Sequence, residues 1–228
     1  MSTRAQLRTR VRQYLDETSE AYWTDTELNS WINQAYFYYY MWVVQTFDGY
    51  FTKDTLVSIV AGQAKYLVPS DFFKVRLVER VYDTFTVPLR VYDRMESANI
   101  TSNSNFSNLY LPTYRFEGQN IVLEPTPDSN ITDGIRLEYV PFATQMTLDT
   151  SIPDAGYLEM WEEPIVIRAA ISAKMKEEAV ANTGTDLGSL GMLLTSWEQN
   201  IKEAMEQRTE MRRYTESWGS EDSSNYYP

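Results

Sequence analysis

The spacing of apolar residues changes twice along the chain, and this limits the fold more than any single motif does. Up to about residue 49, apolar residues recur every three or four positions, which is typical of amphipathic helices. From about 50 to 148 they alternate in short runs separated by turn residues, as in strands. Helical spacing returns after Pro153. The sequence therefore predicts an α+β fold with strands inserted between helices.

We interpret these changes as four segments. Residues 1–49 and 151–215 are expected to supply the helices of an antiparallel bundle. Residues 50–150 are expected to form a β-rich insertion, a small sheet or sandwich that includes a Ser- and Asn-rich loop at 97–109. Residues 216–228 lack periodicity, so we expect an extended C-terminal tail there.

Two capping boxes mark helix starts. Thr3 with Gln6, and Thr24 with Glu27, each place a hydroxyl three residues before a side chain that reaches back to the first N–H. The second helix carries an aromatic run at 36–42. We expect this run to pack against helices of the same or a neighbouring chain, with a platform that stacks sugars or bases as the alternative.

The chain lacks residues on which many enzymes depend. It has no Cys and no His among its 228 residues, which excludes disulfides, thiolate nucleophiles and Ser-His-Asp triads. Adjacent carboxylates occur at Glu162-Glu163, Glu177-Glu178 and Glu221-Asp222. Neighbours on a helix point about 100° apart, so we interpret these pairs as solvated faces. The sequence predicts no enzyme activity, no metal and no cofactor.

The chain is acidic, with a formal net charge of −12, and is therefore not typical of proteins that grip a phosphate backbone. Arg4, Arg8, Arg10 and Arg12 fall on the expected exposed face of the first helix. We interpret them as a solvated or salt-bridged face, with contact to nucleic acid or to an acidic partner as the alternative. No segment approaches the ~20 apolar residues of a membrane span, and the polar start lacks the pattern of a secretory signal.

Three stretches carry a resemblance to a known family. They are WTDTELNSWINQA at 23–35, KYLVPSDFFKV at 65–75 and RLEYVP at 136–141. Together with the Arg-containing first helix and two closing helices, the last expected from Leu187 to Tyr214, they resemble the head-to-tail connector or adaptor proteins of tailed bacteriophages. The resemblance is to those of short-tailed phages especially, and it covers most of residues 3–212.

The resemblance implies a structural virion protein of the neck, made in the host cytoplasm. Such proteins form a dodecameric ring beneath the portal protein, dock on it by their C-terminal segments, receive the tail or nozzle protein on the other face, and let genomic DNA pass. The residues expected to dock on the portal are Tyr214, Trp218, Tyr226, Tyr227 and Pro228. The residues expected in subunit packing are Trp31, Tyr36, Tyr39, Tyr40, Trp42 and Trp197.

Two other functions stay open at this point. One is a β-rich binding module that recognises carbohydrate or another virion protein through its tyrosines. These are Tyr66, Tyr82, Tyr92, Tyr110 and Tyr114. The other is a hydrolase that uses two carboxylates from distant segments, for which no converging motif is present.

Overall fold

The computed structural model describes residues 2–17, 22–46, 49–82, 85–92, 113–153, 161–181 and 187–218, without the side chains of 178–181, 205 and 207–218. The described residues form an α+β protein, as the sequence predicts. The chain divides into two compact units, which we call the helical unit (Met1–Tyr50 with Ala143–Pro228) and the strand unit (Phe51–Phe142). The expected loop at 97–109 lies outside the described residues.

Helix α1 (Arg4–Tyr14) begins at the first predicted capping box. The Gln6 N–H donates to the Thr3 hydroxyl at 3.3 Å, and the Thr3 N–H donates to the Gln6 side chain at 2.8 Å. Leu7 and Val11 lie one turn apart and are fully buried. The apolar spacing of the sequence therefore gives this helix its inner face.

Helix α2 (Asp25–Thr46) begins at the second predicted capping box. The Glu27 N–H donates to the Thr24 hydroxyl at 3.3 Å, and the Thr24 N–H donates to the Glu27 carboxylate at 3.2 Å. Its buried residues follow helical spacing and include most of the aromatic run. They are Leu28, Ile32, Asn33, Ala35, Tyr36, Tyr39, Tyr40, Val43 and Val44.

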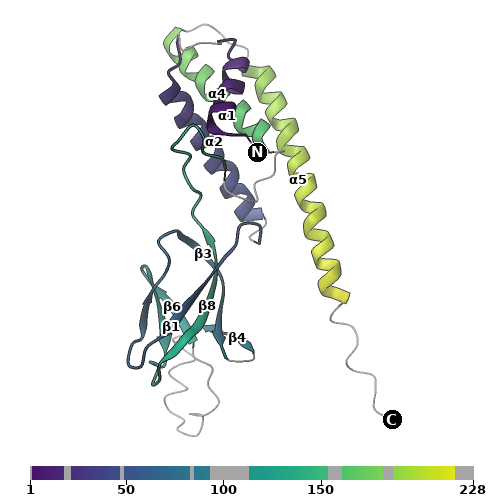
Figure 1. The fold of residues 1–228 in the computed structure, drawn as a ribbon. Helices are drawn as coiled ribbons and strands as arrows, with labels where there is room; N and C mark the ends of the chain where they lie inside the picture. The colour runs from purple at the N-terminus through teal and green to yellow at the C-terminus, as the bar shows by residue number, and fades with distance from the viewer. Residues whose placement is uncertain are drawn as a thin grey trace, which may run out of the picture. The chain divides into compact units, whose positions relative to one another are not determined.

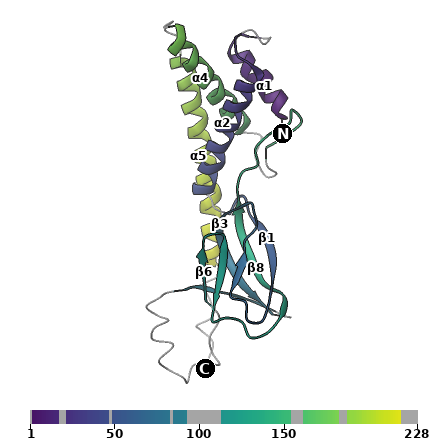
Figure 2. The ribbon, with the colours of Figure 1, turned by 90° about the vertical axis from the view of Figure 1, so that its left-hand side faces the viewer.

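Helix α4 (Glu162–Ala181) contacts each of the other described helices of the helical unit (Figures 1 and 2). Pro164 stands in its first turn, where a missing N–H costs no hydrogen bond. Its buried residues lie on most sides of the helix because it has neighbours on most sides. They are Glu162, Pro164, Ile165, Val166, Ile167, Ala169, Ala170 and Ala173.

Helix α5 (Leu187–Trp218) packs on α4. Leu190, Leu194 and Ile201 are buried, in agreement with the near-heptad spacing of the sequence. The helix continues to Trp218, past its expected end at Tyr214. The first residues of the expected extended tail are therefore helical.

The described strands form two four-stranded sheets. The first has the order β1-β8-β3-β4, made of β1 (Lys53–Ile59), β8 (Ile131–Pro141), β3 (Phe72–Val81) and β4 (Thr86–Pro88). The second has the order β2-β7-β6-β5, made of β2 (Lys65–Leu67), β7 (Asn120–Glu124), β6 (Thr113–Glu117) and β5 (Arg90–Val91). The strand pairs are antiparallel, except for β5 with β6, which run parallel.

Side chains from both sheets form one buried core in the strand unit. Alternate residues of β8 point into it, and Tyr66 and Tyr114 come from the second sheet. The full set is Ile59, Tyr66, Val68, Val78, Leu89, Tyr114, Ile121, Leu123, Ile135, Leu137 and Tyr139. Two sheets that share a core in this way form a small sandwich.

Gly134 of β8 lets two neighbouring side chains approach the strand backbone closely. A Cβ there would lie 2.6 Å from Arg80 Nη1 and 2.8 Å from Ile59 Cδ1. Arg80 Nη1 also donates to the Gly134 carbonyl oxygen at 3.0 Å. The glycine therefore lets the Arg80 side chain lie against the strand backbone.

Candidate functional site

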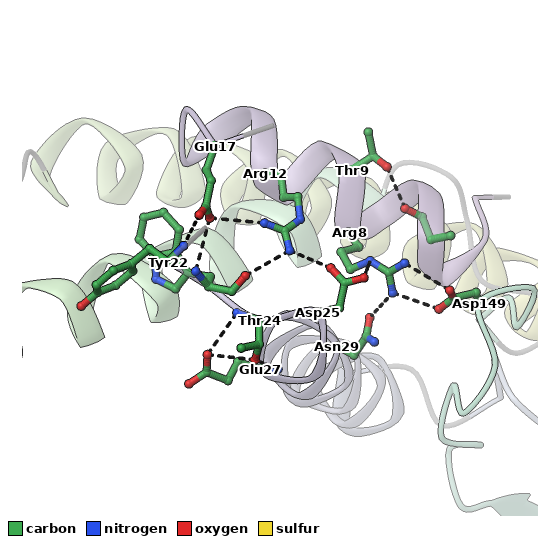
Figure 3. Close-up of polar contacts among 12 residues, drawn as sticks. Arg8, Thr9, Arg12, Glu17, Tyr22, Thr24, Asp25, Glu27, Asn29 and Asp149 are labelled. Carbon is green, nitrogen blue, oxygen red and sulfur yellow. Dashed lines mark hydrogen bonds and ion pairs between the residues drawn. The ribbon is translucent and has the colours of Figure 1, made fainter. Parts of the chain in front are cut away.

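The arginines of α1 connect this helix to other parts of the helical unit (Figure 3). Arg4 Nη2 donates to Asp149 Oδ1 at 2.8 Å. Arg8 Nη1 and Nη2 donate to the two oxygens of the same carboxylate at 2.9 and 3.1 Å, and Nη1 also donates to Asn29 Oδ1 of α2 at 3.1 Å. Asp149 lies in the segment 143–153 that leads into α4, so both arginines fix this segment against α1.

Arg12 is the most deeply placed of the four, with 9% of its side chain exposed. Arg12 Nη2 donates to the Trp23 carbonyl oxygen at 3.0 Å and to Asp25 Oδ1 at 2.7 Å, and Nη1 donates to Glu17 Oε2 at 3.3 Å (Figure 3). Arg8 Nε lies 3.3 Å from Asp25 Oδ2. Two arginines of α1 therefore share one carboxylate in the first turn of α2. A negative charge at this position is also stabilised by the N-terminus of the helix.

Arg10 binds the adjacent carboxylates at the start of α4. Arg10 Nη1 donates to Glu162 Oε2 at 3.1 Å, and Nη2 donates to Glu163. The Ser2 hydroxyl donates to Glu162 Oε2 at 2.6 Å, and the Tyr14 hydroxyl donates to Glu163. Glu162 is only 6% exposed, so the prediction of a solvated face is wrong for this pair. The planar fork of one arginine spans two side chains that point in different directions.

These contacts decide how the four arginines should be interpreted. Each arginine donates to a carboxylate of its own chain, so the interpretation of these residues as salt-bridged is confirmed. The expectation that they lie on an exposed face is wrong. The partners Asp149, Glu162 and Glu163 lie far away in the sequence. No spacing within the first helix could have revealed them.

The pKa of Asp149 records the strength of these contacts. The hydrogen bond from Arg8, followed by that from Arg4, lowers this pKa from 3.8 to about 2. Because the pKa is lower in the folded chain than in the unfolded chain, the unfolded chain takes up the proton first as the pH falls. The contribution to stability is present above about pH 4 and is lost as the pH falls toward 2.

A buried amide of α2 holds the same segment. Asn33 Nδ2 donates to the Met146 carbonyl oxygen at 3.1 Å, and the Met146 N–H donates to Asn33 Oδ1 at 3.0 Å. Arg4 Nη1 donates to the same carbonyl at 2.9 Å, and the Arg4 N–H donates to the Ser151 carbonyl oxygen at 2.8 Å. Sequence reasoning missed Asn33, because one polar residue in a helix fits the surface as well as the core.

The aromatic residues predicted for subunit packing fall into two groups. Tyr36, Tyr39 and Tyr40 have at most 1% of their surface exposed. They lie in the core of their own chain and have no surface left for a neighbouring subunit. The half-buried members of the set are Trp31, Trp42 and Trp197.

Tyr39 also takes part in a polar cluster that joins α2, α4 and α5. Its hydroxyl donates to Glu198 Oε1 at 2.8 Å, and Arg168 Nη1 lies 3.5 Å from the same oxygen. The Arg168 guanidinium carbon lies 3.5 Å from the centroid of the Tyr38 ring, a cation–π contact. Burial, followed by the hydrogen bond to Glu198, raises the pKa of Tyr39, so the hydroxyl stays a donor.

A comparison with families of known proteins covers almost the whole chain. The family model described as SU10 adaptor protein matches residues 2–222. The chain belongs to the SU10 adaptor protein family. The resemblance to phage head-to-tail adaptors that the sequence shows is thereby confirmed. No curated protein matches the chain by sequence.

Membership in this family makes the chain a structural adaptor of a bacteriophage virion. The family implies contacts with other virion proteins and is not an enzyme family. Among the described residues, no group of three or more acidic side chains is arranged to hold a metal ion. Within the same residues, no helix is both long and apolar enough to cross a membrane.

The adaptor's predicted portal-docking residues lie at and beyond the end of α5. Tyr214 and Trp218 are in the helix, with side chains outside the description. Tyr226, Tyr227 and Pro228 lie outside the described residues. Their role as portal contacts therefore stays a prediction.

The tyrosines of the alternative binding module do not form one surface on the adaptor. Tyr66 and Tyr114 are buried in the core of the strand unit, whereas Tyr82 is exposed. Tyr92 is half-buried, with the Arg115 guanidinium carbon 5.6 Å from its ring centroid. Tyr110 lies outside the described residues.

Proposed function

We propose that this adaptor forms a dodecameric ring between the portal and the tail or nozzle protein of the virion. In this proposal genomic DNA passes through the ring, and the C-terminal residues dock on portal subunits. Residues 1–49 and 151–215 form the antiparallel bundle of the ring body, residues 50–150 are its β-rich insertion, and residues 216–228 are the docking arm.

The observation that carries the proposal is the length of α5 relative to what it packs on. Its 32 residues span about 48 Å, whereas the 20 residues of α4 span about 30 Å. The last buried residue among the described side chains of α5 is Ile201. The helix continues for about 25 Å beyond it to Trp218 (Figures 1 and 2). A helix that continues this far past its last buried residue among the described side chains supports an arm that reaches a partner protein.

The sequence at the end of α5 and beyond it fits the same role. The proposed docking residues are Tyr214, Trp218, Tyr226, Tyr227 and Pro228. Aromatic residues are the usual anchors of protein interfaces, and here Tyr226 and Tyr227 follow a polar stretch at 219–225 that is rich in Ser and acidic residues. Trp31, Trp42 and Trp197 retain exposed surface for the proposed packing between subunits.

Two charge observations support the passage of DNA. The chain has a net charge of −12, and the arginines of α1 are already bound to carboxylates of the same chain. Firm binding to DNA requires cations that replace the counterions of the phosphates. A ring of such chains would let DNA slide through with little adhesion.

The docking arm is tested by co-sedimentation with the portal protein. One variant replaces Trp218, Tyr226 and Tyr227 with Ala, and the matched control replaces Ser220, Ser223 and Ser224 with Ala. We expect the aromatic variant to lose portal binding while its far-UV circular dichroism is unchanged, and the serine variant to bind as wild type. Equal binding by both variants would contradict the arm.

A further inference from the structure

The strand unit has two edges at which no described strand completes the sheet. In the two strand orders, β1 and β2 stand at one end and β4 and β5 at the other. The chain joins β1 to β2 through residues 60–64, and Leu89 alone joins β4 to β5. The strands β1 and β2 therefore lie together at one side of the sandwich, and β4 and β5 lie together at the opposite side. We call β1 with β2 the first edge and β4 with β5 the second edge.

Exposed apolar side chains of the strand unit gather at these edges. Of the seven large apolar residues exposed in its described part, six lie on an edge strand or in a turn next to one; the seventh is Phe142. Those of the first edge are Leu56, Val60 and Leu67. Those of the second edge are Tyr82, Phe85 and Val91. Tyr82 and Phe85 stack on each other with ring centroids 4.7 Å apart.

The outer faces of the two sheets also carry ion pairs between neighbouring strands. On the first sheet, Arg136 of β8 bridges Asp54 of β1 at 2.6 Å and Glu79 of β3 at 3.6 Å. On the second sheet, Arg115 of β6 pairs with Glu124 of β7 at 3.1 Å. Cross-strand ion pairs of this kind suit a face in contact with water. The exposed apolar side chains nevertheless belong to the edge strands and the turns beside them, with Leu56 of β1 directly opposite Arg136, and exposed apolar edge strands of this kind suit a protein partner.

We propose that neighbouring copies of this chain meet at these edges, with the first edge of one copy against the second edge of the next. The apolar side chains of the two edges would then cover each other. Backbone N–H and C=O groups on the outer side of β1 would gain partners from the neighbouring strand. This inference rests on the ring proposed above and names the surfaces through which its subunits touch in the strand unit.

The pair of opposite edges is what points to a second copy as the occupant. A single foreign protein needs one apolar patch, whereas this unit has two, on opposite sides. Pairing of like edges would cover one patch per copy and leave the other exposed. Pairing of unlike edges covers both, and a contact between unlike surfaces can close into a ring.

Cysteine cross-linking tests the pairing, because the natural chain has no Cys and so gives no cross-linked product. Leu67 and Val91 are 70% and 66% exposed, so each tolerates replacement. The full chain is prepared as Leu67→Cys, as Val91→Cys and as the double variant, then treated with a short bismaleimide. We expect no product from either single variant alone, dimers from their mixture, and a ladder of multimers from the double variant.

Two further variants complete the design. The double variant Lys74→Cys with Glu117→Cys places cysteines at exposed positions on inner strands and controls for random collisions. The double variant Leu56→Cys with Phe85→Cys repeats the edge test at other residues, in case one substitution weakens the contact.

Negative-stain imaging of the same samples, with and without portal, separates this inference from the proposed function. If rings form but neither edge double variant cross-links more than the inner-strand control, the edge pairing is overturned and the proposed ring is retained. Dimers from a single variant alone also overturn it. A chain that forms no oligomer with or without portal overturns both proposals.

Discussion

Replacement of Arg12 by Met tests the contacts that hold α1 in the helical unit. Met keeps the packing of the aliphatic stem but removes the guanidinium. Glu17, with only 11% of its side chain exposed, then loses its cationic partner, and the Trp23 carbonyl oxygen loses the Arg12 donor. Asp25 is 43% exposed and keeps its ion pair with Arg8. Water and this second partner therefore limit how much stability is lost when its contact with Arg12 is removed.

The magnitude follows from the groups left behind. A buried carbonyl without its donor costs about 1–3 kcal/mol, and a hydrogen bond to a charged group contributes about 1.5–3 kcal/mol. The variant no longer has to bury the charge of Arg12, and the desolvation cost that it saves offsets part of this loss of stability. We therefore expect the free energy of unfolding of the helical unit to fall by about 3–5 kcal/mol, as when one member of a buried ion pair is removed.

Tryptophan fluorescence in urea measures this loss. All six Trp residues lie in the helical unit, so the signal reports on that unit alone. The matched control is Gln13→Met, which places the same side chain at the exposed neighbouring position and should change stability by less than about 0.5 kcal/mol. Arg12→Lys keeps the charge without the fork and should fall between the two. A loss for Arg12→Met no larger than for the control would refute the reasoning.

Three further predictions concern other positions. Gly134→Ala should lower the stability of the strand unit by about 1 kcal/mol in thermal unfolding, because the new Cβ displaces Arg80; an unchanged melting temperature contradicts this. Asn33→Leu should lower the free energy of unfolding of the helical unit by about 2–4 kcal/mol in the same fluorescence assay, because the Met146 N–H loses its acceptor. A loss below about 1 kcal/mol argues against a stabilising role of the hydrogen bonds between Asn33 and Met146. Between pH 4 and 2, the melting temperature of the wild type should fall more steeply than that of Asp149→Asn, and parallel curves rule out the lowered pKa.

The elements that could be predicted from the sequence depend on neighbours along the chain. The capping boxes at Thr3 and Thr24 bond within three residues, so their sequence pattern is enough to place both helix starts. The alternation of residues 135–140 likewise shows which side of β8 faces the core. Local patterns of this kind account for the α+β class and for most of the strands.

What the sequence could not predict depends on contacts between distant residues. Arg10 on a helical wheel belongs to a polar face, and only the folded chain brings Glu162 to it. Asn33 bonds to Met146, more than a hundred residues away. The parallel pairing of β5 with β6 also arises from tertiary placement, because adjacent short strands usually pair antiparallel.

The central claim, that this SU10 adaptor forms a ring beneath the portal, is tested most directly by imaging. A tagged copy of the full chain is used to retrieve its complex from the native source, and the complex is examined by negative-stain electron microscopy. The account predicts a rotationally symmetric ring stacked on a second, larger ring. A lone small particle, with no ring and no companion, would contradict it.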